Sequence, residues 1–237
     1  MPKFTRKSAG ARKIELLGAA LPLFAAKGFA ATTTREIARA ANVSDALLYK
    51  YFPNKESIYR ELMAFCVGKV ESAGARLELM EKNTASFVRA VYFLMYVVRF
   101  GGPEVDSHKA CMDKLLLQDL LGNGDVIRLF HAERIAPWIE KLKDYYLATI
   151  DAGDATGDRA SALNRLWLAQ QLAFVIQIQS LPGQNTVRFR GHERQVFEEA
   201  VVFALRGLGL TQQAIDRYFD PIEIYEFVQK VFAESEL

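Results

Sequence analysis

Residues 41–52 read Ala41-Asn42-Val43-Ser44-Asp45-Ala46-Leu47-Leu48-Tyr49-Lys50-Tyr51-Phe52 and predict a turn followed by a short helix. Ser44 is expected to cap this helix, because its hydroxyl can accept a hydrogen bond from a free backbone N–H at the helix start. Leu48 and Phe52 recur at helical spacing and, with Val43, predict the buried side. The outer side combines a small residue with hydroxyl, phenol and ammonium groups: Ser44, Ala46, Tyr49, Lys50 and Tyr51. Such a surface can approach a nucleic-acid groove closely and donate to phosphate oxygens.

A second short helix is predicted directly upstream. Thr33 and Glu36 have the spacing of a capping box, in which each side chain bonds the backbone N–H of the other residue. Ile37, Ala38 and Ala41 then form a small apolar side that permits close packing. Two short capped helices joined by a turn are typical of a helix-turn-helix, whose second helix lies in the major groove of DNA.

Between Ile14 and Leu62 the chain carries a spaced set of residues: Leu23-Phe24, Gly28-Phe29, Thr32-Thr33-Thr34, Ile37-Ala38, Ala41-Asn42-Val43-Ser44, Leu48-Tyr49, Tyr51-Phe52 and Asn54-Lys55-Glu56. This set resembles the DNA-binding head of the TetR family of bacterial transcriptional repressors. The resemblance implies a regulator, a homodimer formed through late helices, and a lever helix that begins near Asn54 and joins the head to a second domain. It covers only the N-terminal part of the chain and implies little about the remainder.

The residues expected to contact DNA come from both short helices and from the start of the lever helix. Tyr49, Tyr51 and Lys55 are expected to bind phosphate. Base edges are expected nearest to Thr34, Lys50 and the residues from Ser44 to Ala46. The complete predicted set is Thr34, Arg35, Ser44, Asp45, Ala46, Tyr49, Lys50, Tyr51 and Lys55.

Two positions of the second short helix depart from the family pattern. Asp45 stands where Lys, Arg or Gln is frequent, and Leu47 stands where a small hydroxyl residue is common. We expect Asp45 either to accept a hydrogen bond from a cytosine amino group or to stabilise the positive end of the helix. Leu47 is expected to contact a thymine methyl group in place of a phosphate.

The formal net charge of +2 is divided unevenly along the chain. Residues 1–60 carry 11 Lys or Arg and 4 Asp or Glu, a net +7, whereas the remainder carries −5. The basic end is the helix-turn-helix end, as neutralisation of phosphate requires. Because neither a run of 18 apolar residues nor the core of a signal peptide is found, we expect a cytoplasmic protein that does not enter a membrane. Cys66 and Cys111 are expected to be reduced thiols.

The predicted fold is all-α, with a three-helix head at residues 1–54 and a helical ligand-binding and dimerisation domain at residues 55–237. The head is expected to begin with a basic arm from Pro2 to Gly10. Its first helix is predicted from Ala11 to Ala26, with a distortion at Pro22 and a stop at Gly28. The later helices are predicted at Thr84–Phe100, Pro103–Leu121, Asp125–Ile150 with a kink before Pro137, Asp158–Leu181, His192–Leu208, and Pro221–Ala233 with a capping box.

Aromatic and amide side chains concentrate on several of these later helices. Aromatic residues at helical spacing are typical of a core, and that alternative stays open. Tyr, Trp and Gln also need polar partners when buried, which favours an apolar pocket with a few polar groups. We therefore predict a small, largely hydrophobic effector. Its predicted contacts are Tyr92, Tyr96, Phe130, Trp138, Trp167, Gln171 and Phe174.

The predicted helices Asp158–Leu181 and His192–Leu208 are apolar on more than one side. A helix that is apolar nearly all round must be buried nearly all round. These helices are therefore either central in a monomer or paired between two copies. We predict a homodimer, because a protein that reads the two halves of a pseudo-palindromic operator needs two-fold symmetry. Substitution of Ala169 or Val201 by Arg is expected to separate the copies.

Catalysis has little support in the sequence. His108, His131 and His192 lie in no recognisable nucleophile motif, and no glycine-rich phosphate loop is present. His108 and Cys111 are one helical turn apart, but two ligands make weak support for zinc. We therefore predict no enzyme activity, no metal and no cofactor. A helical enzyme and a protein-interaction module that binds no specific DNA remain the alternatives.

Overall fold

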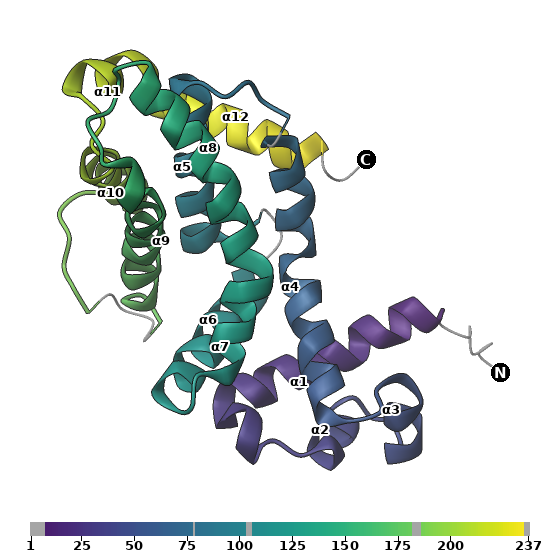
Figure 1. Ribbon diagram of the computed structural model, residues 1–237. Coiled ribbons are helices and arrows are strands. Elements are labelled where there is room, and N and C mark those ends of the chain that lie inside the picture. Colours follow the sequence, from purple (N-terminus) through teal and green to yellow (C-terminus); the bar gives the residue numbers. More distant parts are fainter. Residues whose placement is uncertain (1–7, 78, 103–105, 182–185, 235–237) are drawn as a thin grey trace. The chain divides into compact units, whose positions relative to one another are not determined.

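The computed structural model describes residues 8–77, 79–102, 106–181 and 186–234 (Figure 1). Within these ranges the chain is helical, and the one pairing of extended backbone is an isolated bridge between Ala155 and Leu210. The prediction of an all-α fold is therefore confirmed. Most of the expected basic arm, Pro2 to Gly10, lies outside the described residues.

The chain divides into two compact units. Unit 1 comprises Met1–Val67 with Ser107–Arg128, and unit 2 comprises Gly68–Asp106 with Leu129–Leu237. The helices of unit 1 are α1 (Ala9–Ala31), α2 (Thr34–Ala40), α3 (Asp45–Tyr51), the first part of α4 (Lys55–Leu77), α6 (Asp106–Leu121) and α7 (Asp125–Phe130). The functional boundary predicted at residue 54 stays a prediction, because compact units need not coincide with functional domains.

The core of unit 1 is made by side chains that recur at helical spacing along α1 to α4. Its fully buried members include Leu16, Leu21, Phe24, Ile37, Leu48, Phe52, Ile58 and Leu62. Helix α1 extends beyond its predicted end, but its backbone leaves the helical region at Gly28, where φ is 79°. Glycine is suited to this angle because it has no Cβ. By length and composition alone α1 could cross a membrane, and one of its sides packs into this core.

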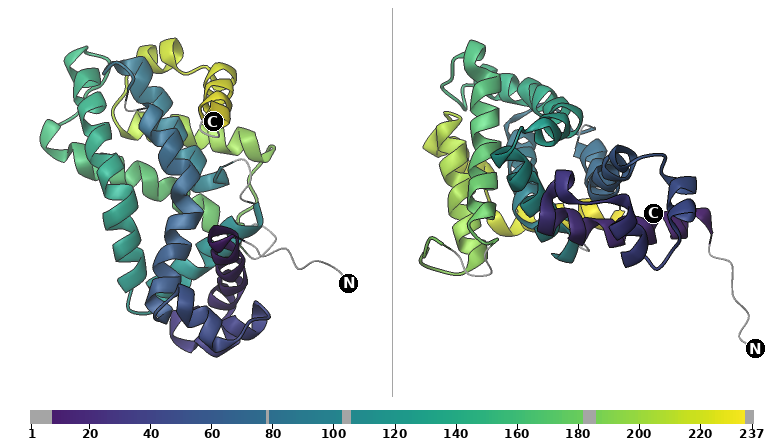
Figure 2. Two further views of the ribbon diagram at one scale, coloured as in Figure 1. Left: turned by 90° about the vertical axis from the view of Figure 1, so that its right-hand side faces the viewer. Right: turned by 90° about the horizontal axis from the view of Figure 1, so that it is seen from below.

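Helix α5 is the centre of unit 2. It packs against α8, α9, α10, α11 and α12 (Figures 1 and 2). Its run from Phe87 to Met95 is largely buried. The helices of unit 2, besides the end of α4, are α5 (Thr84–Phe100), η1 (His131–Ile135), α8 (Ala136–Asp151), η2 (Arg159–Ser161), α9 (Ala162–Ile178), α10 (Glu193–Gly207), α11 (Gln212–Tyr218) and α12 (Pro221–Ala233).

The distortion predicted before Pro137 is confirmed. The five residues of η1 form a π-helical turn between α7 and α8. Proline at position 137 has no N–H to donate and cannot continue the regular hydrogen-bond ladder, so a wider turn absorbs the break. Single π-turns of this kind are frequent at functional sites.

Two details of the later helices differ from the sequence analysis. Helix α11 was not predicted, although Thr211 caps it by accepting from the backbone N–H of Ala214 at 3.1 Å. At α12, Asp220 caps as predicted, and the Glu223 carboxylate accepts from Arg89 at 2.6 Å. The cap of α12 is therefore confirmed, while its glutamate links α12 to α5.

Candidate nucleic-acid interface and effector site

Hydrogen bonds at the ends of α2 and α3 hold the two helices in shape. The capping box is present: Glu36 N donates to Thr33 Oγ1 at 3.2 Å, and Thr33 N donates to Glu36 Oε2 at 3.0 Å. The Lys27 ammonium bonds the same carboxylate and, with Thr33, lowers the pKa of Glu36 to about 2. Ser44 Oγ accepts from Leu47 N at 3.2 Å, as predicted. Both caps of the motif are confirmed.

The turn between the two helices depends on Asn42. Its φ of 52° lies in the left-handed region, which Asn adopts more readily than most residues. Asn42 N donates to Arg39 O at 3.1 Å, and Val43 N donates to Ala38 O at 2.9 Å. These bonds end α2 and direct the chain into α3.

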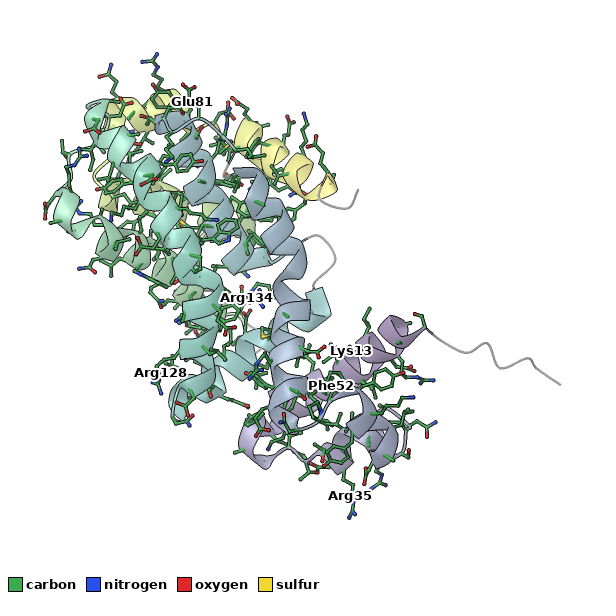
Figure 3. All side chains as sticks on the ribbon, turned by 45° about the vertical axis from the view of Figure 1, so that its right-hand side comes forward. Lys13, Arg35, Phe52, Glu81, Arg128 and Arg134 are labelled. Atoms are coloured by element: carbon green, nitrogen blue, oxygen red, sulfur yellow. The ribbon has the colours of Figure 1, made fainter. Side chains whose placement is uncertain are left out.

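Two side-chain contacts join α2 to α3 on the outer side of the motif. The Thr34 and Tyr49 hydroxyls lie 2.9 Å apart. Arg35 Nε lies 3.6 Å from Asp45 Oδ2, and the Arg35 side chain is 88% exposed. Figure 3 shows Arg35 pointing away from the ribbon into open space. The predicted surface residues are therefore linked in pairs across the two helices.

The other predicted contacts on α3 lie where the helical period places them. Ser44, Ala46 and Lys50 are exposed, and Tyr51 is half-buried. On the opposite side, Leu48 and Phe52 have no exposed surface. The division of α3 into a buried side and an outer side is therefore as predicted, except that Val43 and Leu47 are half-buried.

Lys55 lies differently from the sequence expectation. Its ammonium donates to Phe29 O at 2.7 Å, Thr32 O at 2.9 Å and Ala30 O at 3.2 Å, and lies 4.4 Å from the centre of the Phe29 ring. A lysine ammonium has three N–H donors, so these carbonyls account for all of them. Lys55 thereby caps the end of α1. The sequence offered no sign of this contact, because it joins residues more than 20 positions apart.

Comparison with known proteins places this motif in a family. A model of the bacterial regulatory proteins of the tetR family matches residues 16–62, which span the helices described above. Residues 16–62 are therefore similar to the DNA-binding domain of TetR-family regulators. A curated HTH-type transcriptional regulator of Bacillus subtilis, YvkB, is 45% identical over 49 residues, and the repressor KstR2 of Rhodococcus jostii is 46% identical over 52. These matches cover 21% and 22% of this chain, which spans 26% of the length of each relative.

Solved structures of low sequence identity share the fold over most of the chain. AmtR of Mycobacterium smegmatis is 20% identical, with a TM-score of 0.57 and 97% of both chains covered. AibR, solved in complex with isovaleryl coenzyme A and operator DNA, is 16% identical, with a TM-score of 0.60 and coverage of 81% of this chain and 97% of AibR. The named relatives are transcriptional regulators, in line with the prediction from the sequence of no enzyme activity.

The residues predicted to bind an effector do not meet at one place in unit 2. Tyr92 is fully buried, with its ring 5.0 Å from Phe197 and its hydroxyl without a hydrogen-bond partner among the described residues. Burial raises the pKa of Tyr92 far above its usual value. The neighbouring Tyr96 hydroxyl accepts from Gln229 at 3.1 Å. These two tyrosines belong to the core between α5, α10 and α12.

Trp138, another predicted effector contact, lies apart from these tyrosines, against α4. Its indole stacks on Phe93 at 5.5 Å between centroids. A Cβ placed on Gly74 would lie 1.4 Å from Trp138 Cζ2, so glycine makes room for this indole. A cavity of ≈ 20 Å³ lies beside it, lined by Gly74, Leu77, Ala90, Trp138, Lys141, Leu142 and Tyr145. This volume suits about one water molecule and not an effector.

The third place lies along α9 and the π-turn. Trp167, Gln171 and Phe174 follow one another at helical spacing and are all half-buried. The Trp167 ring contacts His131 at 5.6 Å between centroids, and Phe130 lies 6.1 Å from the same imidazole. Burial lowers the pKa of His131. His131 is not among the effector contacts predicted from the sequence; the proline that forces the π-turn was the available signal.

Helices α9 and α10 expose large apolar side chains. Leu168 and Val175 of α9 are 69% and 49% exposed, and Phe203 of α10 is 68% exposed. Ala169 and Val201, which were chosen from the sequence as dimer positions, are only 6% and 0% exposed. Arg at either position would therefore disturb the core of one copy. This choice of test positions was wrong, because both helices are apolar on their inner and outer sides alike.

Proposed function

We propose that this chain is a cytoplasmic transcriptional repressor of the TetR family that binds operator DNA as a homodimer and releases it when a small, largely hydrophobic molecule binds unit 2. The observation that carries the proposal is the outer side of α2 and α3, where capped helices expose polar and basic groups within a TetR-type motif. The net charge of +7 over residues 1–60 supports a polyanionic partner.

In this proposal the outer side divides its contacts between phosphates and bases. Tyr49, Lys50 and Tyr51 donate to phosphate oxygens, since phenol and ammonium groups are common phosphate ligands. The base edges meet Thr34, Arg35 and the first residues of α3, from Ser44 to Ala46. Lys55 supports the interface indirectly, because its ammonium holds the end of α1 in place.

The exposed apolar residues of α9 and α10 are the proposed dimer surface. Leu168, Val175 and Phe203 would be buried when two copies pair these helices, which removes an apolar surface from water. The dimer would place its two recognition helices about 34–36 Å apart, or a multiple of that, to meet successive major grooves of a pseudo-palindromic operator.

The proposed effector contacts are narrowed to the side of α9 that faces the π-turn. Phe130, Trp167, Gln171 and Phe174 remain from the sequence prediction, and His131 joins them. Tyr92, Tyr96 and Trp138 are assigned to the surrounding core, because all three are engaged in ring stacks and Tyr92 is also fully buried. The structure of AibR in complex with isovaleryl coenzyme A and operator DNA supports the proposal that a protein of this fold can bind both a ligand and DNA.

An effector can release DNA only if its affinity for the conformation that cannot bind DNA is higher than its affinity for the conformation that can. An affinity ratio of about 100 corresponds to about 2.7 kcal/mol of coupling, within the usual range for allostery. Trp167→Ala is expected to abolish release by the effector and to leave DNA affinity nearly unchanged.

The test is binding of the purified chain to DNA taken from upstream of its own gene. We expect affinity for a specific site that falls steeply with salt, as counterion release requires. A helical enzyme or a protein-interaction module would bind that DNA no better than unrelated DNA. Failure to prefer any sequence at low salt would refute the proposed function.

A further inference from the structure

The outer side of α10 carries opposite charges on either side of an exposed aromatic ring. Glu199, Phe203 and Arg206 recur at spacings of four and three residues, so they lie on one side of the helix. Phe203 is 68% exposed, and the Glu199 and Arg206 side chains are exposed as well. Val202 is half-buried and lies next to Phe203 at the centre of this side. These four residues are called the α10 stripe below.

The two charges of the α10 stripe are not neutralised by an opposite charge among the described residues. Glu199 Oε1 accepts from Gln195 Nε2 at 3.1 Å, and a terminal amino group of Arg206 donates to Gln212 Oε1 at 2.9 Å. Both partners are neutral amides, so they orient the two side chains without cancelling their charges. The carboxylate and the guanidinium can therefore each pair with an opposite charge on another molecule.

A second copy of α10 in antiparallel orientation matches the order of these residues. When a two-fold axis passes between Val202 and Phe203, each residue faces the residue at the same distance beyond the axis. Glu199 then faces Arg206 of the partner subunit. Because Glu199 and Arg206 are seven residues apart, each lies about 5 Å from the axis along the helix. Packed helices are about 8–10 Å apart, a distance that Glu and Arg side chains can span together.

The opposite orientation of the two helices is disfavoured by the same charges. In a parallel pair each residue faces its own copy, so Glu199 would meet a carboxylate and Arg206 would meet a guanidinium. Like charges placed opposite each other are destabilising at an interface. The antiparallel pair instead forms two equivalent ion pairs around an apolar centre of Val202 and Phe203.

Helix α9 contributes apolar area but no charge that could select the orientation. Leu168, Leu172 and Val175 follow one another at helical spacing on its outer side, with no charged residue among them. The two helices lie side by side with opposite directions, since Arg165 near the start of α9 donates to Gly207 O at the end of α10 at 3.3 Å. The charges of the α10 stripe are therefore the feature that distinguishes one pairing from another.

We propose that a second copy of this chain covers the α10 stripe, with the two α10 helices antiparallel and Glu199 of each copy paired with Arg206 of the partner subunit. The inference rests on the proposed function and adds the orientation and register of the homodimer. It also gives a basis for partner choice, because a related chain with another order of charges would leave Glu199 or Arg206 unpaired or beside a like charge.

Charge reversal in the purified full-length chain tests this pairing. Glu199→Arg and Arg206→Glu each place like charges opposite each other at two equivalent positions. Each should raise the dimer dissociation constant at least about tenfold in analytical ultracentrifugation. The double variant restores opposite charges in exchanged positions and should dimerise like the wild type. An equimolar mixture of the two single variants should form heterodimers, detected by native mass spectrometry, because every basic side chain then faces an acidic one.

Two further variants serve as controls. Glu226→Arg makes the same change of charge at an exposed position of α12, outside the α10 stripe, and should leave the dimer unchanged. Glu199→Gln removes the charge without reversing it, so it should weaken the dimer less than Glu199→Arg does. Thermal melting of each variant checks that unit 2 is folded.

Two results would overturn the inference and leave the proposed function in place. The first is a set of folded single variants that dimerise as tightly as the wild type. The second is a failure to restore dimers both in the double variant and in the mixture, which would show that Glu199 and Arg206 do not face each other. A wild-type chain that is monomeric and prefers no DNA sequence would instead remove the proposed function together with the inference.

Discussion

Replacing Lys55 by Met removes three hydrogen-bond donors and keeps most of the apolar stem. The bonds to Phe29 O and Thr32 O are partly buried, whereas the bond to Ala30 O is exposed and can be replaced by water. A hydrogen bond to a charged group contributes about 1.5–3 kcal/mol, and leaving buried carbonyls unpaired has a similar cost. Loss of the contact with the Phe29 ring adds about 0.5–1 kcal/mol. The two part-buried bonds at the lower end of that range contribute about 3 kcal/mol together. With the ring contact added, we expect Lys55→Met to lower the free energy of unfolding by about 3.5–4 kcal/mol.

Chemical denaturation of the full-length chain measures this loss, and salt-dependent DNA binding distinguishes the two roles of Lys55. If Lys55 contacts phosphate, Lys55→Met should leave the free energy of unfolding unchanged. The slope of log affinity for DNA against log salt concentration should then fall in magnitude by about one unit. A cap on α1 predicts reduced stability with the slope unchanged while the protein is folded. Lys50→Met is the control, because Lys50 is exposed and should alter DNA binding without altering stability. Unchanged unfolding of Lys55→Met would refute the assignment of Lys55 to the end of α1.

Three further predictions concern unit 2. Gly74→Ala should lower the free energy of unfolding by about 1–3 kcal/mol, because its Cβ would overlap the Trp138 indole; normal unfolding with unchanged tryptophan fluorescence would contradict this. Leu168→Arg and Phe203→Arg should give folded monomers by light scattering, since both side chains are exposed in one copy, and persistent dimers would exclude this surface. Burial lowers the pKa of His131 in the folded protein, so His131 binds a proton more readily in the unfolded chain. The free energy of unfolding should therefore fall as the pH drops below about 6.5. His131→Gln should reduce that loss in denaturation curves at pH 7 and pH 5, and an identical pH dependence would show that other groups cause it.

Much of the helical architecture could be predicted because its signals are local. Thr33 with Glu36, Ser44, and Asp220 act on N–H groups two or three residues away, so a cap can be recognised from spacing alone. The predicted span Thr84–Phe100 agrees with α5 for the same reason. Helix α11 has only seven residues, too few for a clear apolar period. Helices α2 and α3 are equally short, but unlike α11 they lie within the stretch that resembles a known family.

The candidate sites were predicted less completely. The outer side of α3 followed from its helical period, but the pairing of Arg35 with Asp45 depends on how α2 and α3 cross. The aromatic residues assigned to one effector pocket proved to lie in separate places, with Tyr92 in the core and Trp167 beside His131. Composition indicates that aromatic side chains must find partners, and it does not indicate which partners they find.

The sequence by itself determined the helix-turn-helix, its caps, its buried residues Leu48 and Phe52, and the basic charge of its end of the chain. These features need only neighbouring residues, a helical period or a count of charges. The tertiary structure decided that Lys55 binds the carbonyls of α1, and that Leu168 is exposed while Ala169 is buried. The physical reason is that a lysine can reach any acceptor the fold brings near, and a helix that is apolar all round does not specify its outer side until neighbouring helices cover the rest.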